Sequence, residues 1–219
     1  MKRGTDMDRI ITIGRQFGSG GHESGKRLAE KLGIPFYDKE ILTLTAEKTH
    51  FAESYLEKID EKRPSLLSMG MGTGAMNDSV VNYFYNLSPN DQAFLEMGNV
   101  MKDLAKKGPC VITGRCADYV LKDFNPINFF ISAKLEDRIN RKLALEEHSE
   151  LTPDEMEKII TTTDKNRSKY YEYYTHEKWG EAFHYHMCID TSSVGVDGAV
   201  ELMRLFVEEF GKKSIMPDK

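Results

Sequence analysis

The segment from residue 10 to residue 33 constrains the fold more than any other part of this chain. It begins with a β-branched apolar run at Ile10–Ile13, passes through a turn with four glycines between Gly14 and Gly21, and ends in a helical pattern that Gly33 terminates. Glycine lets the backbone amides of such a turn point toward one centre, and the helix that follows adds free N–H groups and the positive end of its dipole. The sequence therefore predicts a strand, a phosphate-binding loop and a helix.

Two registers of this loop are open. In one, Gly20–Lys26 follows the Gly-x-x-x-x-Gly-Lys pattern, but Arg27 stands where the pattern has Ser or Thr. In the other, which runs gap-free from the strand and which we favour, Gly21 stands where such loops carry lysine, so the loop cation must come from Arg15 or Lys26. A glycine-rich turn without a ligand is the third interpretation. The residues predicted to bind phosphate are Gly18, Ser19, Gly20, Gly21, His22, Glu23, Ser24 and Gly25.

Beyond the loop, apolar runs and amphipathic patterns alternate along the chain. The predicted strands are Ile34–Asp38, Cys110–Thr113, Asn128–Ile131 and His186–Asp190. The predicted helices cover residues 39–50, 90–107, 135–147 and 196–210, and a further helix runs from Thr152 towards Trp179. Strands that alternate with helices through right-handed crossovers build a five-stranded parallel sheet covered on both faces.

Local signals mark several of these boundaries. Asn90 could cap the helix that follows it, and Thr152, Pro153 and Glu155 combine a capping hydroxyl, a first-position proline and a third-position glutamate. Between Phe51 and Asn90 the periodic pattern of apolar residues is interrupted. This stretch contains Arg63-Pro-Ser, the run Met69–Gly74 and Tyr83–Tyr85, and it predicts an inserted mobile segment or a surface linker.

Composition limits the class of protein. A chain of 219 residues fits one ordinary core with an inserted subdomain, and its net charge of −5 argues against a protein that coats nucleic acid. No apolar run approaches a membrane span and no signal-type core follows Met1, so we expect a cytoplasmic protein without a membrane partner. Cys110, Cys116 and Cys188 lack metal-ligand spacing and are expected to be buried free thiols. A homo-oligomer remains open.

In a parallel α/β sheet, ligands bind outside the carboxyl ends of the strands. Besides Arg15 and the glycine loop, the residues predicted at those ends are Asp38, Arg115, Asp118, Ser132 and Asp190–Ser192. Arg115 follows a buried strand and a glycine, so we expect its guanidinium to reach the rim opposite the loop.

Five stretches of the chain together resemble the cytidylate kinase-like family, a branch of the P-loop nucleoside monophosphate kinases. They are Ile11–Ala29, Phe36–Glu40, Val111–Val120, Asp164–Tyr171 and Cys188–Ser192, and the similarity spans residues 9–210. The resemblance implies a single three-layer α/β domain over residues 8–212 of the P-loop NTPase type, with a five-stranded parallel sheet, an inserted helical acceptor-binding segment at residues 39–90 and a helical lid at residues 133–180.

The resemblance also implies an activity. It is the transfer of the terminal phosphoryl group of ATP, with Mg²⁺, to a nucleoside monophosphate, CMP or dCMP first. The residues implied to be catalytic are Arg15, Lys26, Arg138, Arg141 and Arg167, and those implied to bind the substrate are Asp38, Arg115, Asp118 and Asp164. The metal ligands are unassigned; Asp118, or Glu23 if it turns inward, is the candidate.

The chain departs from the family pattern in the loop. Gly21 replaces the lysine, His22 and Glu23 replace the hydroxyl residues, and Thr113 stands where an acid often precedes Gly-Arg. Two other functions therefore stay open: a nucleotide-binding or sensing module with little turnover, and a kinase of a small metabolite that is not a nucleotide. Arg138 and Arg141 could also form an ordinary solvated helix face. The aromatic run Tyr170–Tyr174 with Trp179 is expected to pack rather than to stack on a base.

Overall fold

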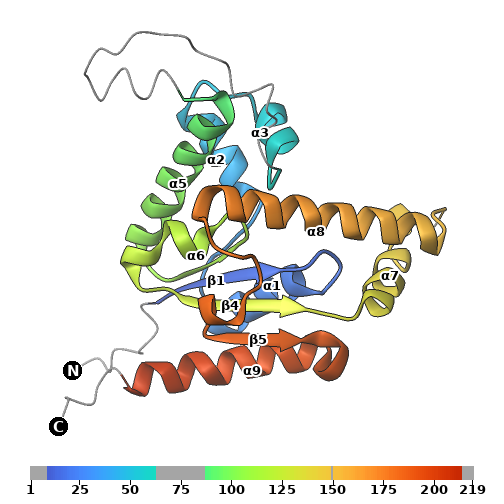
Figure 1. The fold of residues 1–219 in the computed structure, drawn as a ribbon. Coiled ribbons are helices and arrows are strands. Elements are labelled where there is room, and N and C mark those ends of the chain that lie inside the picture. The colour runs from blue at the N-terminus through green and yellow to red at the C-terminus, as the bar shows by residue number, and fades with distance from the viewer. Residues whose placement is uncertain (1–8, 63–86, 149, 214–219) are drawn as a thin grey trace, which may run out of the picture.

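The computed structural model describes residues 9–62, 87–148 and 150–213, which form a three-layer α/β arrangement (Figure 1). Its centre is a five-stranded sheet in the order β2-β3-β1-β4-β5, with every neighbouring pair parallel. The strands are β1 (Ile10–Arg15), β2 (Phe36–Tyr37), β3 (Cys110–Thr113), β4 (Ile127–Ser132) and β5 (Met187–Asp190). The predicted fold class is confirmed.

The register makes β1 the middle of the sheet. Ile11 pairs with Val111 of β3 on one side and with Ile127 of β4 on the other. Because the chain visits β2 and β3 on one side of β1 before it crosses to β4 and β5, the strand order switches at β1. In open α/β sheets the crevice at such a switch, outside the carboxyl ends of the strands, is where ligands bind.

Helices cover both faces of the sheet. On one face, α1 (Gly21–Leu32) packs against α9 (Thr191–Lys213) over side chains of β1, β4 and β5. On the other face, α2 (Glu40–Lys48), α3 (Glu53–Ile59), α5 (Pro89–Lys107) and α6 (Ala117–Val120) enclose a second apolar cluster. The predicted stripe on α5 lies largely in this cluster, with Met97, Val100, Met101 and Leu104 buried.

Two further helices stand at the loop end of the sheet. In Figure 1, α7 (Leu135–Leu143) lies beside the turn between β1 and α1, and α8 (Pro153–Thr175) runs from there across the sheet. The capping box at Thr152 and Glu155 forms as predicted and starts α8. Short 3-10 turns cover Lys122–Phe124, Glu146–His148 and Ala182–His184.

Several predicted boundaries are wrong by a few residues. Ser88, not Asn90, caps α5, because its hydroxyl accepts the N–H of Asp91 while Pro89 takes the first position. α9 begins at Thr191, five residues before the expected start, and Gly195 interrupts it with φ 69. α8 ends at Thr175 because His176 turns left-handed, with φ 60. Met69–Gly74 and Tyr83–Tyr85 lie outside the described residues.

The cysteines are free thiols, but only two are buried. Cys110 and Cys116 lie in the interior, whereas Cys188 is exposed because β5 is an edge strand. Within the described ranges, none of the helices combines the length and apolar character needed to cross a membrane.

Candidate functional site

The turn between β1 and α1 has the geometry of the gap-free register. Gly18 and Gly20 adopt left-handed φ values of 77 and 81, and α1 begins at Gly21, directly after them. Gly25 and Lys26 lie inside α1, so the alternative register, which would open the helix there, is wrong. The loop therefore spans Gln16 to Gly20.

The structure separates the two candidate loop cations. An ideal Cβ built on Gly21 would lie 2.5 Å from the Cβ of Arg15, so the side chain of Arg15 fills the space where a residue at position 21 would begin. Its guanidinium runs under Gly114 towards the end of β3 and is buried. Lys26 has an exposed side chain on α1. Of the two, Arg15 is the cation at the rim.

Helices α7 and α8 hold the backbone of the loop. The N–H of Phe17 donates to Asp164 at 2.7 Å, the guanidinium of Arg138 donates to the carbonyl of Phe17 at 3.3 Å, and that of Arg141 donates to the carbonyl of Gly18 at 2.6 Å. Arg138 is buried and also pairs with Asp164. The solvated-face interpretation of these arginines is therefore wrong. Asp164, expected to bind substrate, has both oxygens engaged in the loop contacts.

A second tight turn follows β3. Gly114, Arg115 and Cys116 all have positive φ, at 77, 55 and 55, which is uncommon for side-chain-bearing residues and marks local strain. The turn folds the side chain of Arg115 back into the protein, where only 2% of the residue is exposed. One guanidinium nitrogen donates to Asp38 at 2.8 Å and the other to Asp60 at 2.7 Å.

The pKa values of both carboxylates are shifted by this environment. Burial opposes the ionisation of Asp38, but the hydrogen bond with His22 at 2.7 Å and the charges of Arg115 and Arg15 hold its pKa well below the usual range. Burial raises the pKa of Asp60, with Glu61 adding to the rise and Arg115 opposing it. Arg115 is thus paired on both sides.

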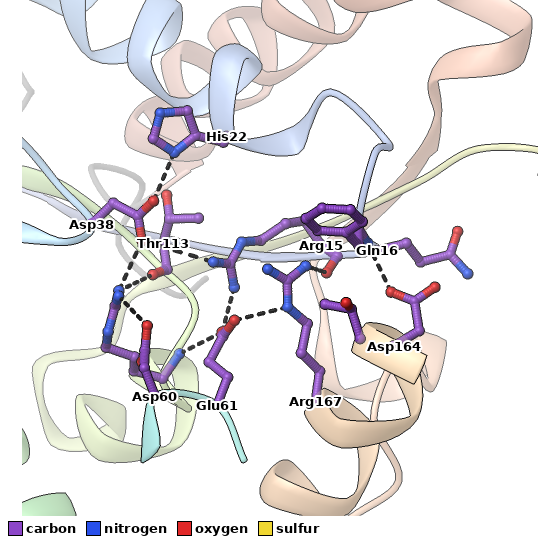
Figure 2. Close-up of polar contacts among 12 residues, drawn as sticks. Arg15, Gln16, His22, Asp38, Asp60, Glu61, Thr113, Asp164 and Arg167 are labelled. Atoms are coloured by element: carbon purple, nitrogen blue, oxygen red, sulfur yellow. Dashed lines mark hydrogen bonds and ion pairs between the residues drawn. The ribbon is translucent and has the colours of Figure 1, made fainter. Parts of the chain in front are cut away.

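Glu61, two residues after the end of α3 at Ile59, lies at the centre of the site. Figure 2 shows its carboxylate between Arg15 and Arg167, with contacts to both. Nε of Arg167 donates at 2.7 Å, the backbone N–H of Arg115 donates at 3.2 Å, and the guanidinium of Arg15 pairs with the same carboxylate. Although burial would raise the pKa of Glu61, the charges of Arg15, Arg167 and Arg115 lower it to about 2.

A small cavity of about 20 Å³ lies against this cluster. Its wall includes Asp118, Trp179 and the aromatic side chains of Tyr170, Tyr171 and Tyr185. Tyr171 donates to Asp118 at 2.8 Å. Burial raises the pKa of Asp118, and the hydrogen bond from Tyr171 opposes the rise. The aromatic run packs, as expected: Tyr170 and Tyr171 are buried.

The other predicted residues divide between the loop and its surroundings. Ser19 is buried, and its carbonyl accepts the hydroxyl of Thr191 at 2.6 Å. Glu23 points along the exposed side of α1 to Arg27, at 3.3 Å, rather than inward. Ser24 is buried, with no hydrogen-bond partner for its hydroxyl among the described residues. Arg167 also donates to the carbonyl of Arg15 at 3.1 Å.

Sequence reasoning missed Asp60 and Glu61. The two acids directly follow the short charged helix α3, which has no motif spacing and packs beside α2. Thr191 was predicted at the strand ends, but its hydrogen bond to the carbonyl of Ser19 in the loop was not predicted. Within the described ranges, no group of three or more metal-binding side chains gathers.

Known proteins share this architecture. A search of curated proteins finds no match. An uncharacterized protein from Eubacterium ventriosum is 27% identical, with a TM-score of 0.65 over 91% of this chain and 98% of that one. A shikimate kinase from Bacteroides thetaiotaomicron is 14% identical, with a TM-score of 0.53 over 91% of this chain and 98% of that one. A gluconokinase from Sinorhizobium meliloti is 15% identical, with a TM-score of 0.51 over 95% and 98%.

The last two structures are similar to this chain in fold alone. The sequence model of one family, described as the cytidylate kinase-like family, matches residues 10–193, which is most of the chain. The resemblance inferred from the five motifs is confirmed by this match. The chain belongs to the cytidylate kinase-like family.

Proposed function

We propose that this protein transfers the terminal phosphoryl group of ATP to a small-molecule acceptor. The observation that carries the proposal is the convergence of Arg15, Arg167 and the backbone N–H of Arg115 on one position between the glycine loop and the turn after β3. Phosphoryl transfer depends on positioning two substrates and neutralising charge between them, so cationic groups at that position are what the reaction requires.

The loop supports the ATP side of the proposal. Gly20 has no room for a side chain, because an ideal Cβ there would lie 2.8 Å from Val196, and the guanidinium of Arg141 lies beside it. The first N–H groups of α1 have no partners inside the helix and face the same end of the sheet. Arg15 supplies the charge that a loop lysine would supply.

The residues also suit Mg²⁺ held through phosphates. This ion commonly takes one or two protein oxygens and completes its shell with water and substrate phosphates. Asp38 is ionised and lies at the carboxyl end of β2, so it is the carboxylate we assign to this task or to the acceptor. When bound, the ion would neutralise charge on the transferring phosphoryl group.

For the acceptor we propose a nucleoside monophosphate, with CMP or dCMP as the first choice. The family match supports this class. A second candidate is a neutral metabolite with several hydroxyl groups. It is favoured by the acidic lining of the acceptor side, where Asp38 and Asp60 flank Arg115 and could accept hydrogen bonds from hydroxyls.

The test is a screen for acceptor-dependent ADP release with ATP and Mg²⁺, first over CMP, dCMP, UMP, AMP and GMP, then over sugars and hydroxy acids. Mass spectrometry of the product should show one added phosphoryl group. ATP binding without turnover by any acceptor would replace the transferase by a nucleotide-binding or sensing module. Turnover with hydroxyl compounds alone would select the second candidate.

A further inference from the structure

The carboxylate of Glu61 occupies a position that is built for an oxyanion. Its three donors come from separate elements: Arg15 ends β1, Arg115 belongs to the turn after β3, and Arg167 belongs to α8. Both carboxylate oxygens are used, Oε1 by Arg15 and the N–H of Arg115, and Oε2 by Arg167. A phosphoryl group offers the same kind of acceptors with more charge.

The segment that holds Glu61 is less firmly packed than the segments that hold the arginines. Glu61 has a left-handed φ of 50, and it follows the seven-residue helix α3, of which Leu56 is the buried residue. Arg15 and Arg115, by contrast, extend from central strands of the sheet or from the turn directly after them. An anion that enters the site can therefore move Glu61 at less cost than it can move the arginines.

We infer that Glu61 is an internal competitor, a carboxylate that holds the phosphoryl position in the free protein and is displaced when a substrate phosphate binds. That the ligand is a phosphoryl group rests on the proposed function; that the position binds an oxyanion rests on the three donors. In the free state Glu61 neutralises the arginines and keeps the site ordered. It also makes the site selective, because only an anion that binds the arginines more strongly than Glu61 does can displace it.

The test compares Glu61→Gln with Glu57→Gln, which removes the same charge from an exposed position on α3, the helix that precedes Glu61. Calorimetry with inorganic phosphate, without ATP or acceptor, should show binding about tenfold tighter for Glu61→Gln, since one charge-assisted competitor is lost. Glu57→Gln should bind phosphate as the native protein does. Unchanged phosphate affinity in a folded Glu61→Gln variant would overturn the inference.

Two arms identify the phosphate that replaces Glu61. If it is the terminal phosphate of ATP, Glu61→Gln should increase the affinity for ATP more than the affinity for ADP. If it is the acceptor phosphate, the variant should increase the affinity for CMP more than the affinity for cytidine. If Glu61→Gln changes the affinity for ATP and ADP equally, and that for CMP and cytidine equally, the position does not bind a phosphoryl group of either substrate. Phosphate binding needs no turnover, so a failed acceptor screen with tighter phosphate binding would reject the proposed function and leave the oxyanion site in place.

Glu61→Gln removes the charged partner of Arg15, which is buried, and of Arg167, which is half-buried, so a second variant covers the case in which Glu61→Gln does not fold. Glu61→Asp keeps the charge but withdraws the carboxylate by one methylene, and it should bind phosphate more tightly than the native protein. Addition of phosphate should also raise its melting temperature more than that of Glu57→Gln. A purely structural Glu61 predicts lower stability and no gain in either measurement.

Discussion

The Cβ of Arg15 lies 2.5 Å from the place where a Cβ on Gly21 would stand. The two positions are therefore exclusive: one of them can carry a long cationic side chain and the other must stay small. A lysine directly after the last loop glycine is the usual arrangement in phosphate-binding loops. In this chain the cation has moved to the end of β1, and the glycine at position 21 makes room for it.

This exclusion predicts a pair of coupled substitutions. Gly21→Lys alone should destabilise the protein by about 1–3 kcal/mol through overpacking, and Arg15→Gly alone should weaken ATP binding. The double variant Arg15→Gly/Gly21→Lys should recover both the stability and the ATP affinity. Thermal unfolding measures the first, and calorimetry with a non-hydrolysable ATP analogue measures the second. Arg15→Ala/Gly21→Lys is the control, because it keeps the clashing Cβ and should not recover. Additive losses in the first double variant would show that the positions are independent.

Arg15 should matter more than Lys26 for binding ATP. Arg15 is buried at the site, whereas Lys26 is exposed on α1. Arg15→Ala should reduce ATP affinity by about tenfold or more, as expected for a charge-assisted contact, and Lys26→Ala by about twofold or less. The reverse order in a titration would reinstate Lys26 as the loop cation.

Arg115→Lys tests the turn after β3. Lysine keeps the charge but cannot reach Asp38 and Asp60 with two separate nitrogens, so the buried network loses a contact. We expect a loss of about 2 kcal/mol in the free energy of unfolding and, once an acceptor is known, an acceptor KM at least about tenfold higher, with ATP affinity little changed. Normal stability and normal kinetics together would mean that this guanidinium does not organise the acceptor side.

Asp164→Asn tests the contact between α8 and the glycine loop. The carboxylate accepts the N–H of Phe17 and pairs with Arg138, so its neutral replacement should loosen the loop and weaken ATP binding by about tenfold. Asp154→Asn changes an exposed carboxylate on the same helix and should leave ATP binding unchanged. Equal affinities for both variants would contradict a loop held by α8.

Acid should destabilise the protein partly through Glu61. Its folded-state pKa of about 2 lies below the ordinary value of 4.5, so its ion pairs contribute fully above pH 4.5 and are lost as the pH falls toward 2. Between pH 5 and pH 2.5 the native protein should lose about 1–3 kcal/mol more unfolding free energy than Glu61→Gln, measured by urea titration. Parallel pH profiles for the two proteins would show that Glu61 does not titrate with its pKa lowered.

The sequence by itself determined the layers of this protein and the place of its glycine loop. Apolar runs at Cys110–Thr113 and around Asn128 are strands because buried parallel strands tolerate few polar residues, and the glycines before α1 fixed the loop because only they adopt its left-handed turns without strain. The capping box at Thr152 acts within four residues, so local chemistry was enough to predict it.

Only the tertiary structure decided which charged residues meet. Glu61 reaches Arg15 and Arg167 across 46 and 106 positions of sequence, and no local pattern distinguishes it from the acids of α3 just before it. The packing of α7 and α8 against the loop turned Arg138 from an apparent surface residue into a buried partner of Phe17 and Asp164. Strand and helix signals are local because they arise from backbone sterics and periodic burial. Ion pairs depend on distances that exist only once the sheet has brought the separate elements together.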